Sequence, residues 1–339
     1  MILPIILLFV YLVFYNISQR NTNRSISFAV VITMILVCIA AFRSPISPDY
    51  QNYAGLYDYE HDNKEIGYLA LIRFSKLLSS QPVLFFFLSA AISVSLKVFA
   101  IRRISPLFSL CLIVYISNVF ILHDMIQMRA AISSGLLLWS LYFYCNDDIK
   151  KSLLFSCAGV LFHYSAVVGF LIYLLGRKGF NKSLAISLLL VSYVLAILGI
   201  RFGNVFGLIT WGTVAHLWNT YSELMLTGEQ TKINVFNTYF LVRILVCLVL
   251  VINYNRIKGF GCIYTVGLKM YVLSICIYLL FSDIPVLAFR LSELFQVVEV
   301  FLFSSLIYLF KDKMVGRLLV VTLATAFLLV NLFHNQLVV

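Results

Sequence analysis

Charged residues are scarce in this sequence. Only 12% of its 339 residues are Asp, Glu, Lys or Arg, whereas 62% are hydrophobic, and the mean hydropathy is +0.99. A water-soluble domain needs roughly a quarter of its residues charged to cover its surface, so the composition argues against a soluble fold. The apolar runs also lack a period of two, which argues against a transmembrane β-barrel.

Cysteine pairs with a recognisable function are missing as well. The seven cysteines form no CxxC pair and no His/Cys spacing typical of a metal site. Nearly all of them lie inside apolar runs, so we interpret them as small core residues. We expect neither a metal nor a cofactor.

Apolar runs are what the chain has in abundance. Runs of about 18–20 residues recur along its whole length, and each can cross a hydrocarbon core of about 30 Å. They predict an all-α, polytopic membrane protein with about 10–12 transmembrane helices, forming one integral membrane domain over residues 1–339. Residues 1–15 lack a basic region and a cleavage site, so we interpret them as the first spanning helix and not a cleaved signal.

The basic residues concentrate in six short loops between the apolar runs. These loops hold fourteen of the 25 Lys and Arg residues and comprise 17–24, 102–106, 146–151, 176–182, 253–259 and 311–317. By the positive-inside rule all six are predicted to be cytoplasmic. The net charge of +11 is thereby explained by membrane topology, and we expect no nucleic-acid partner.

This topology requires an unusual segment at 152–175. A single span there would place loop 176–182 on the wrong side of the membrane. Two half-helices of about 11 residues, each about 17 Å long, restore the parity if the chain turns back at His163–Ser165. We therefore predict a broken, re-entrant helix at 152–175, with a long helix that tolerates His163 as the alternative.

Two polar loops are predicted on the external side. The first, 43–81, contains the pattern of an amphipathic helix over about 64–79, which we expect at the outer membrane interface. In that helix Ser75 is expected to face water, and Asp62 and Asn63 are N-cap candidates. The second external loop covers 201–235.

Three arginines fall at the outer ends of predicted helices: Arg43, Arg129 and Arg290. Asp49 and His163 are expected at the same level. A cationic pocket of this kind suits an anionic head group, because arginine binds phosphate through two parallel hydrogen bonds. The alternative is that each arginine extends to the interface without binding a ligand.

Other polar residues near this level have two interpretations. Glu293 either neutralises Arg290 one turn away or faces a cavity, because a charge inside a span is costly. Tyr50 and Tyr53 belong either to an interfacial aromatic belt or to a sugar site. His123 and Asp124 are a candidate hydrogen-bonded pair at a helix start.

Several segments resemble, in order, those of the EpsG branch of Wzy-type polysaccharide polymerases. They are "FRSPISPDYQNY", "KEIGYLALIRFSK", "MIQMRAAISSGLLLWSL", "LFHYSAVVGFLIYLL" and "FRLSELF". They run from residue 42 to about 310, and the last is the least diagnostic.

The resemblance implies a GT-C-like, multi-pass glycosyltransferase of the bacterial cytoplasmic (inner) membrane. Such an enzyme polymerises undecaprenyl-pyrophosphate-linked oligosaccharide repeat units of O-antigen or exopolysaccharide at the external, periplasmic face. It transfers the growing glycan to the non-reducing end of a new lipid-linked unit, without a nucleotide sugar or a metal. The implied partners are these lipid-linked oligosaccharides and membrane lipid. Whether a chain-length regulator protein is a further partner is left open by the resemblance.

The resemblance also suggests roles for individual residues. The residues expected to bind the donor pyrophosphate and to stabilise the charge of the leaving group are Arg43, Arg129 and Arg290, of which Arg290 is also a candidate catalytic residue. The candidates for the general base are Asp49 and His163. The residues expected to hold sugars are Tyr50, Tyr53, Gln127 and Glu293.

Two other functions use similar features. A flippase or transporter of a lipid-linked or anionic solute also needs broken helices and intramembrane charge, although the two halves of the chain show no repeat. An O-antigen ligase or another polyprenyl-phosphate glycosyltransferase would share the chemistry and change the acceptor.

Overall fold

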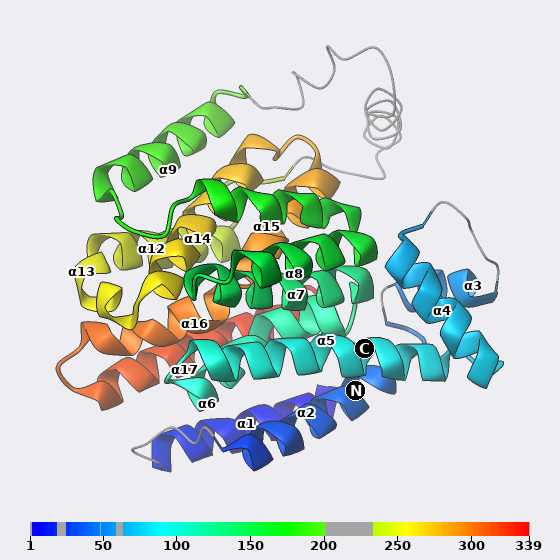
Figure 1. The fold of residues 1–339 in the computed structure, drawn as a ribbon. Helices are drawn as coiled ribbons and strands as arrows, with labels where there is room; N and C mark the ends of the chain where they lie inside the picture. The colour runs from blue at the N-terminus through cyan, green and yellow to red at the C-terminus, as the bar shows by residue number, and fades with distance from the viewer. Residues whose placement is uncertain (1, 19–24, 48, 59–63, 201–232, 339) are drawn as a thin grey trace.

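The computed structural model describes residues 2–18, 25–47, 49–58, 64–200 and 233–338 (Figure 1). Within these ranges the regular elements are helices, and no strand occurs. The prediction of an all-α, polytopic membrane protein is therefore confirmed. Most of the predicted loop 201–235, as well as Asp62 and Asn63, lies outside the described residues.

Short 3-10 or π segments, labelled η, interrupt or extend the α-helices. The elements before residue 200 are α1 (Ile2–Ser18), α2 (Ile26–Ala41), α3 (Tyr50–Asp58), α4 (Ile66–Leu78), α5 (Val83–Ile104), α6 (Phe108–Val114), η1 (Tyr115–Asp124), α7 (Met128–Cys145), α8 (Ile149–Phe162), η2 (Tyr164–Leu174) and α9 (Lys182–Ile197). Those after residue 232 are α12 (Thr238–Ile252), α13 (Tyr254–Ile257), η3 (Lys258–Phe260), α14 (Cys262–Leu280), α15 (Pro285–Gln296), α16 (Glu299–Ser304), η4 (Ser305–Leu309), α17 (Lys313–Leu329) and η5 (Val330–His334).

Three of the described helices are long and apolar enough to cross a membrane: α5, α14 and α17 with its extension η5. The bent pair formed by α12 and α13–η3 raises this number to four if it counts as one span. Six shorter apolar helices of 10–17 residues accompany them, and they include α1, α2 and α9. The prediction of about 10–12 transmembrane helices counted these shorter apolar helices as spans as well. In the bundle α2, α5, α7 and α8 pack against one another in succession (Figure 1).

Five of the six basic loops lie within the described residues, and they group at one end of the bundle: 102–106, 146–151, 176–182, 253–259 and 311–317 (Figure 1). Hydrogen bonds between residues in or next to these loops run from Arg317 to the Asn16 carbonyl, from Arg256 to the Leu309 carbonyl, from Lys182 to the Ile252 carbonyl, from Arg177 to Asp147, and between Ser105 and Tyr264. These bonds agree with the predicted placement of the five loops on one side; most of loop 17–24 lies outside the described residues. Helices begin here because polar side chains cap them: Ser25, Asp148, Asn181 and Asp312 each accept a hydrogen bond from a backbone N–H of the first turn.

The segment 152–175 is broken, as predicted. Helix α8 ends at Phe162, His163 is extended with φ −156° and ψ 115°, and η2 begins at Tyr164. The Tyr173 hydroxyl near the end of η2 lies 2.9 Å from Ser152 Oγ near the start of α8. The two pieces are therefore antiparallel and form a hairpin with His163 at its turn.

The opposite end of the bundle carries a small cap made of α3 and α4. Because α5 has 22 residues and spans about 33 Å, its first residues beside the cap are far from loop 102–106 at its other end (Figure 1). The cap has its own apolar core, which comprises Tyr53, Tyr57, Tyr68, Ile72, Phe85, Phe86 and Met128. Tyr53, Tyr57 and Tyr68 thus form a structural core together with Phe85 and Phe86 of α5.

Helix α4 matches the predicted amphipathic helix at 64–79. Its apolar residues Ile66, Phe74 and Leu77 are exposed, as expected for a helix at the membrane interface. The prediction for Ser75 was wrong: this side chain is fully buried and donates to the carbonyl oxygen of Leu71. Its hydroxyl needs no water because the helix backbone itself supplies the acceptor.

The interpretation of the cysteines as core residues holds for three of the seven: Cys111, Cys247 and Cys276 are buried. Cys145 and Cys262 form a disulfide at the basic-loop end, with their Cα atoms 5.4 Å apart. The sequence separation of 117 residues explains why no spacing pattern indicated this pair. Cys38 and Cys157 are exposed on the apolar helices α2 and α8, so the interpretation was wrong for them.

Candidate substrate-binding pocket

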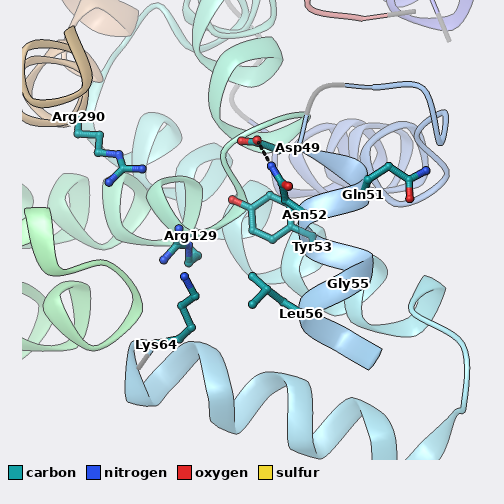
Figure 2. A pocket seen from close by; sticks show the side chains of 9 residues that line it. All are labelled: Asp49, Gln51, Asn52, Tyr53, Gly55, Leu56, Lys64, Arg129 and Arg290. Carbon is teal, nitrogen blue, oxygen red and sulfur yellow. Dashed lines mark hydrogen bonds between the residues drawn. The ribbon is translucent and has the colours of Figure 1, made fainter. Parts of the chain in front are cut away.

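A pocket of about 510 Å³ opens between the cap and the bundle (Figure 2). This volume falls within the range of small-molecule sites. The pocket is lined by Asp49, Gln51, Asn52, Tyr53, Gly55, Leu56, Lys64, Arg129 and Arg290. Helices α3, α7 and α15 therefore meet at one site from widely separated parts of the sequence.

The lining of the pocket is cationic. Figure 2 shows Lys64, Arg129 and Arg290 on one side, facing the residues of α3 on the other. Against these three cations the lining has one carboxylate, that of Asp49. Arg290 is exposed, and within the described part of the chain neither its guanidinium nor the Lys64 ammonium forms an ion pair or a hydrogen bond. These two positive charges are free to interact with an anion.

Asp49 stands at the start of α3. Its backbone has φ 60°, which is uncommon outside glycine but tolerated by Asp, and its carbonyl oxygen accepts from the N–H of Tyr53. One carboxylate oxygen accepts a hydrogen bond of 2.9 Å from the Asn52 amide. The Asp49 carboxylate is therefore held at the rim of the pocket and exposed to solvent.

Arg129 is held by the carboxylate of Glu65, a residue that was not among the site residues predicted from the sequence. Its Nη1 donates to both oxygens of Glu65, at 3.1 and 2.8 Å. The Nδ1 atom of His163 lies 3.2 Å from Oε1 of the same carboxylate. Glu65 directly precedes α4, so the cap, α7 and the α8–η2 hairpin are joined at one side chain. The signal for Glu65 was present in the segment "KEIGY", but nothing local identifies its partners.

Burial by itself would raise the pKa of Glu65, but the hydrogen bond to His163 and the charge of Arg129 outweigh it and lower the pKa to about 2. Glu65 is therefore ionised at neutral pH. His163 is buried directly behind this pair and is not part of the pocket lining.

Of the residues expected to hold sugars, Tyr53 lines the pocket. Tyr50 instead packs against Phe86 with the two rings tilted and their centroids 4.8 Å apart. Gln127 and Glu293 bind each other: the Gln127 amide donates to the Glu293 carboxylate at 3.1 Å. Neither of these two residues lines the pocket.

Arg43 lies in a different environment from the other two arginines. It is buried, and its guanidinium donates to the carbonyl oxygens of Ala40, Asp124 and Met125 at 2.9, 3.1 and 2.6 Å. Its donors thus hold the turn that precedes α7, and Arg43 does not line the pocket. The structure brings Arg129 and Arg290 together and leaves Arg43 outside.

Further buried charges inside the bundle are paired. Lys97 lies 2.8 Å from Asp124, whose carboxylate also accepts from the Tyr115 hydroxyl. The predicted hydrogen bond between His123 and Asp124 was wrong. His123 Nδ1 instead lies 3.0 Å from Ser134 Oγ. Lys97 was not among the residues predicted from the sequence, although a lysine within an apolar run indicates a buried partner.

A second internal pair joins α12 to α16. Arg243 Nε lies 3.2 Å from Glu299 Oε1, and Asn118 donates to Oε2 of Glu299 at 3.1 Å. Both side chains are buried, so the ion pair compensates their opposite charges inside the bundle. Among the described residues no three His, Cys, Asp or Glu side chains gather closely enough to bind a metal ion.

Comparisons with curated proteins and with solved structures gave no match. A comparison with family models matched residues 26–338 to the model described as the EpsG family. The match covers nearly the whole chain, including every residue that lines the pocket. At the general level this family suggests a membrane polysaccharide polymerase. The chain therefore belongs to the EpsG family.

Proposed function

We propose that this protein polymerises lipid-linked oligosaccharide repeat units, with the pocket between cap and bundle as its active site. The observation that carries the proposal is the gathering of Lys64, Arg129 and Arg290 around one cavity. Such a cluster is suited to the pyrophosphate that links a glycan to undecaprenol. Family membership supports the same class of reaction at the general level.

The reaction is a glycosyl transfer. The bond between the anomeric carbon of the growing glycan and the pyrophosphate oxygen breaks, and the pyrophosphate leaves with the electron pair. A bond forms from that carbon to a hydroxyl oxygen on the non-reducing sugar of a new lipid-linked unit. Lys64, Arg129 and Arg290 would stabilise the charge that develops on the leaving pyrophosphate.

The hydroxyl proton needs an acceptor. Asp49 lies in the pocket lining, opposite the cations (Figure 2). His163 lies behind the lining and is connected to Arg129 through Glu65. We propose Asp49 as the first candidate for the base because of its position, and His163 as the second because imidazole accepts protons near neutral pH.

The site would face the exterior of the bacterial cytoplasmic membrane. The positive-inside rule assigns the end at which the five described basic loops lie to the cytoplasm. The cap and pocket lie at the opposite end (Figure 1). Exported lipid-linked units are then the substrates that reach the pocket, and membrane lipid surrounds the exposed face of α4.

The hairpin of α8 and η2 also fits a transporter of lipid-linked solutes, because broken helices occur at transport sites.

A complementation experiment distinguishes a polymerase from a transporter. A strain lacking the gene is complemented with wild type, Arg290→Ala or Asp147→Asn, and its surface polysaccharide is separated on a gel. Asp147 is 84% exposed at the basic-loop end and serves as the control.

We expect a ladder with wild type and Asp147→Asn, and a single-repeat band with Arg290→Ala at equal abundance in the membrane. A deletion strain that exports no repeat unit would favour transport instead. A deletion strain that accumulates long lipid-linked chains would indicate a ligase. An undisturbed ladder in the deletion strain would refute the polymerase proposal.

A further inference from the structure

The segment Glu65–Tyr68 makes three contacts that connect the cap to the rest of the site. A Cβ atom on Gly67 would lie 2.9 Å from the carbonyl oxygen of Leu161, so only glycine lets α4 approach the end of α8 this closely. The ring of Tyr68 is buried, with the guanidinium of Arg129 5.7 Å from its centroid. The close approach at Gly67 is what brings Glu65 within reach of His163.

The Glu65 carboxylate determines the tautomer of His163. With its pKa lowered to about 2, this carboxylate is ionised and can only accept hydrogen bonds. The contact of 3.2 Å with His163 Nδ1 therefore requires the hydrogen to be on Nδ1. In the neutral ring this leaves the lone pair on Nε2, which bonds to none of the described residues.

We propose that Glu65 is a positioning residue of this active site, which holds the Arg129 guanidinium at the pocket wall and fixes His163 as its Nδ1–H tautomer. The contacts on both sides of one buried carboxylate carry this inference. It rests on the proposed function of the pocket as far as catalysis is concerned. Catalytic and metal-binding histidines are commonly oriented in the same way, by a carboxylate that accepts a hydrogen bond from Nδ1–H.

Among the described residues, the side chains that hydrogen-bond to the Glu65 carboxylate are those of Arg129 and His163. Tyr68 follows it on α4 and contacts Arg129 through its ring, while Tyr53 reaches Arg129 from α3. The neighbouring Lys64 turns its side chain to the pocket (Figure 2). A purely structural ion pair between Glu65 and Arg129 would not involve His163. The tautomer of His163 therefore distinguishes a positioning role of Glu65 from a purely structural one.

The first test reads the tautomer directly. The full-length protein in lipid nanodiscs is labelled with ¹⁵N at its five histidines, and His163→Asn assigns the signal. We expect the Nδ1–H tautomer in wild type and in Glu65→Asp. In Glu65→Ala the signal should move to the Nε2–H tautomer that free histidine favours. An Nε2–H signal in wild type would overturn the proposal, whatever the protein catalyses.

The second test separates positioning from binding. Farnesyl pyrophosphate serves as the binding probe, and the polysaccharide ladder reports elongation. Glu65→Gln removes a negative charge near the pocket, so binding should be equal or tighter, while elongation falls about ten-fold or more. Glu65→Asp should restore part of the elongation. Asp147→Asn, a carboxylate-to-amide change at the far end, should leave both unchanged.

The outcomes distinguish the two proposals. Normal elongation by Glu65→Gln, with weakened binding by Arg290→Ala, would refute the positioning role and leave the pyrophosphate site standing. Absence of probe binding by wild type, with a normal ladder for Arg290→Ala, would refute the proposed function. The tautomer measurement would then still decide whether Glu65 orients His163.

Discussion

The side-chain amide of Gln127 lies 3.1 Å from the carboxylate of Glu293, and this hydrogen bond joins the start of α7 to α15. Arg129 follows two residues after Gln127, and Arg290 precedes Glu293 by less than one turn. The bond therefore fixes the spacing of the two arginines that line the pocket, although neither of its members lines the pocket itself.

Gln127→Ala should disturb this spacing. The buried Glu293 carboxylate loses its hydrogen-bond donor, at a cost of about 1–3 kcal/mol, and Arg290 is no longer held opposite Arg129. We expect a lower thermal unfolding midpoint in nanodiscs and weaker binding of farnesyl pyrophosphate. Gln81→Ala, at an exposed position beside the cap, is the matched control. Identical behaviour of the two variants would show that the bond does not set the spacing.

Arg129 and Arg290 should respond differently to replacement. Arg290 is exposed and forms no ion pair or hydrogen bond within the described part of the chain, so Arg290→Ala should leave the unfolding midpoint nearly unchanged and weaken farnesyl pyrophosphate binding about ten-fold. Arg129→Ala should weaken binding and also lower the midpoint, because it leaves the buried Glu65 carboxylate without its cation.

Arg290→Lys provides a finer comparison. Lysine keeps the charge but cannot donate two parallel hydrogen bonds, so we expect binding between that of wild type and that of Arg290→Ala. Equal affinities for all three proteins would place the pyrophosphate elsewhere.

The low pKa of Glu65 predicts a pH dependence of stability. Lowering this pKa from 4.5 to about 2 corresponds to about 3 kcal/mol of stability at neutral pH. Because the folded-state pKa is the lower one, this contribution is complete above pH 4.5 and is lost as the pH falls toward 2. The difference in unfolding midpoint between wild type and Glu65→Gln should therefore be large at pH 7 and shrink at pH 3.5. A difference that is the same at both pH values would contradict the pairing.

Gly67→Ala should separate α4 from α8. The added methyl group would contact the backbone of Leu161, which cannot move aside, so we expect a loss of about 1–3 kcal/mol. Elongation should fall as well, since Glu65 is carried away from His163. Gly259→Ala is the control, because its Cβ would meet nothing within 4 Å. Equal unfolding midpoints for these two variants would show that α4 is not held by this contact.

Local patterns predicted the break at His163 and the helix α4 well. The break followed from the need to return the chain to the basic side within 24 residues, and α4 from the spacing of its apolar residues. Ser75 was misplaced because a serine in an amphipathic helix can bond the helix backbone as readily as water. Helix α3 was not anticipated, because its tyrosines pack on α5 and not on a sequence neighbour.

Hydrophobicity and charge along the chain were sufficient to predict the membrane class of this protein, the positions of its basic loops and the break in its helix at His163. These features are properties of short segments. Helix packing, in contrast, places Arg129 and Arg290 in one pocket and leaves Arg43 to hold a turn. Packing also brings Glu65 into contact with Arg129 and His163, which are 64 and 98 residues away along the chain. Contacts over such separations depend on how the helices pack, and no local pattern encodes them.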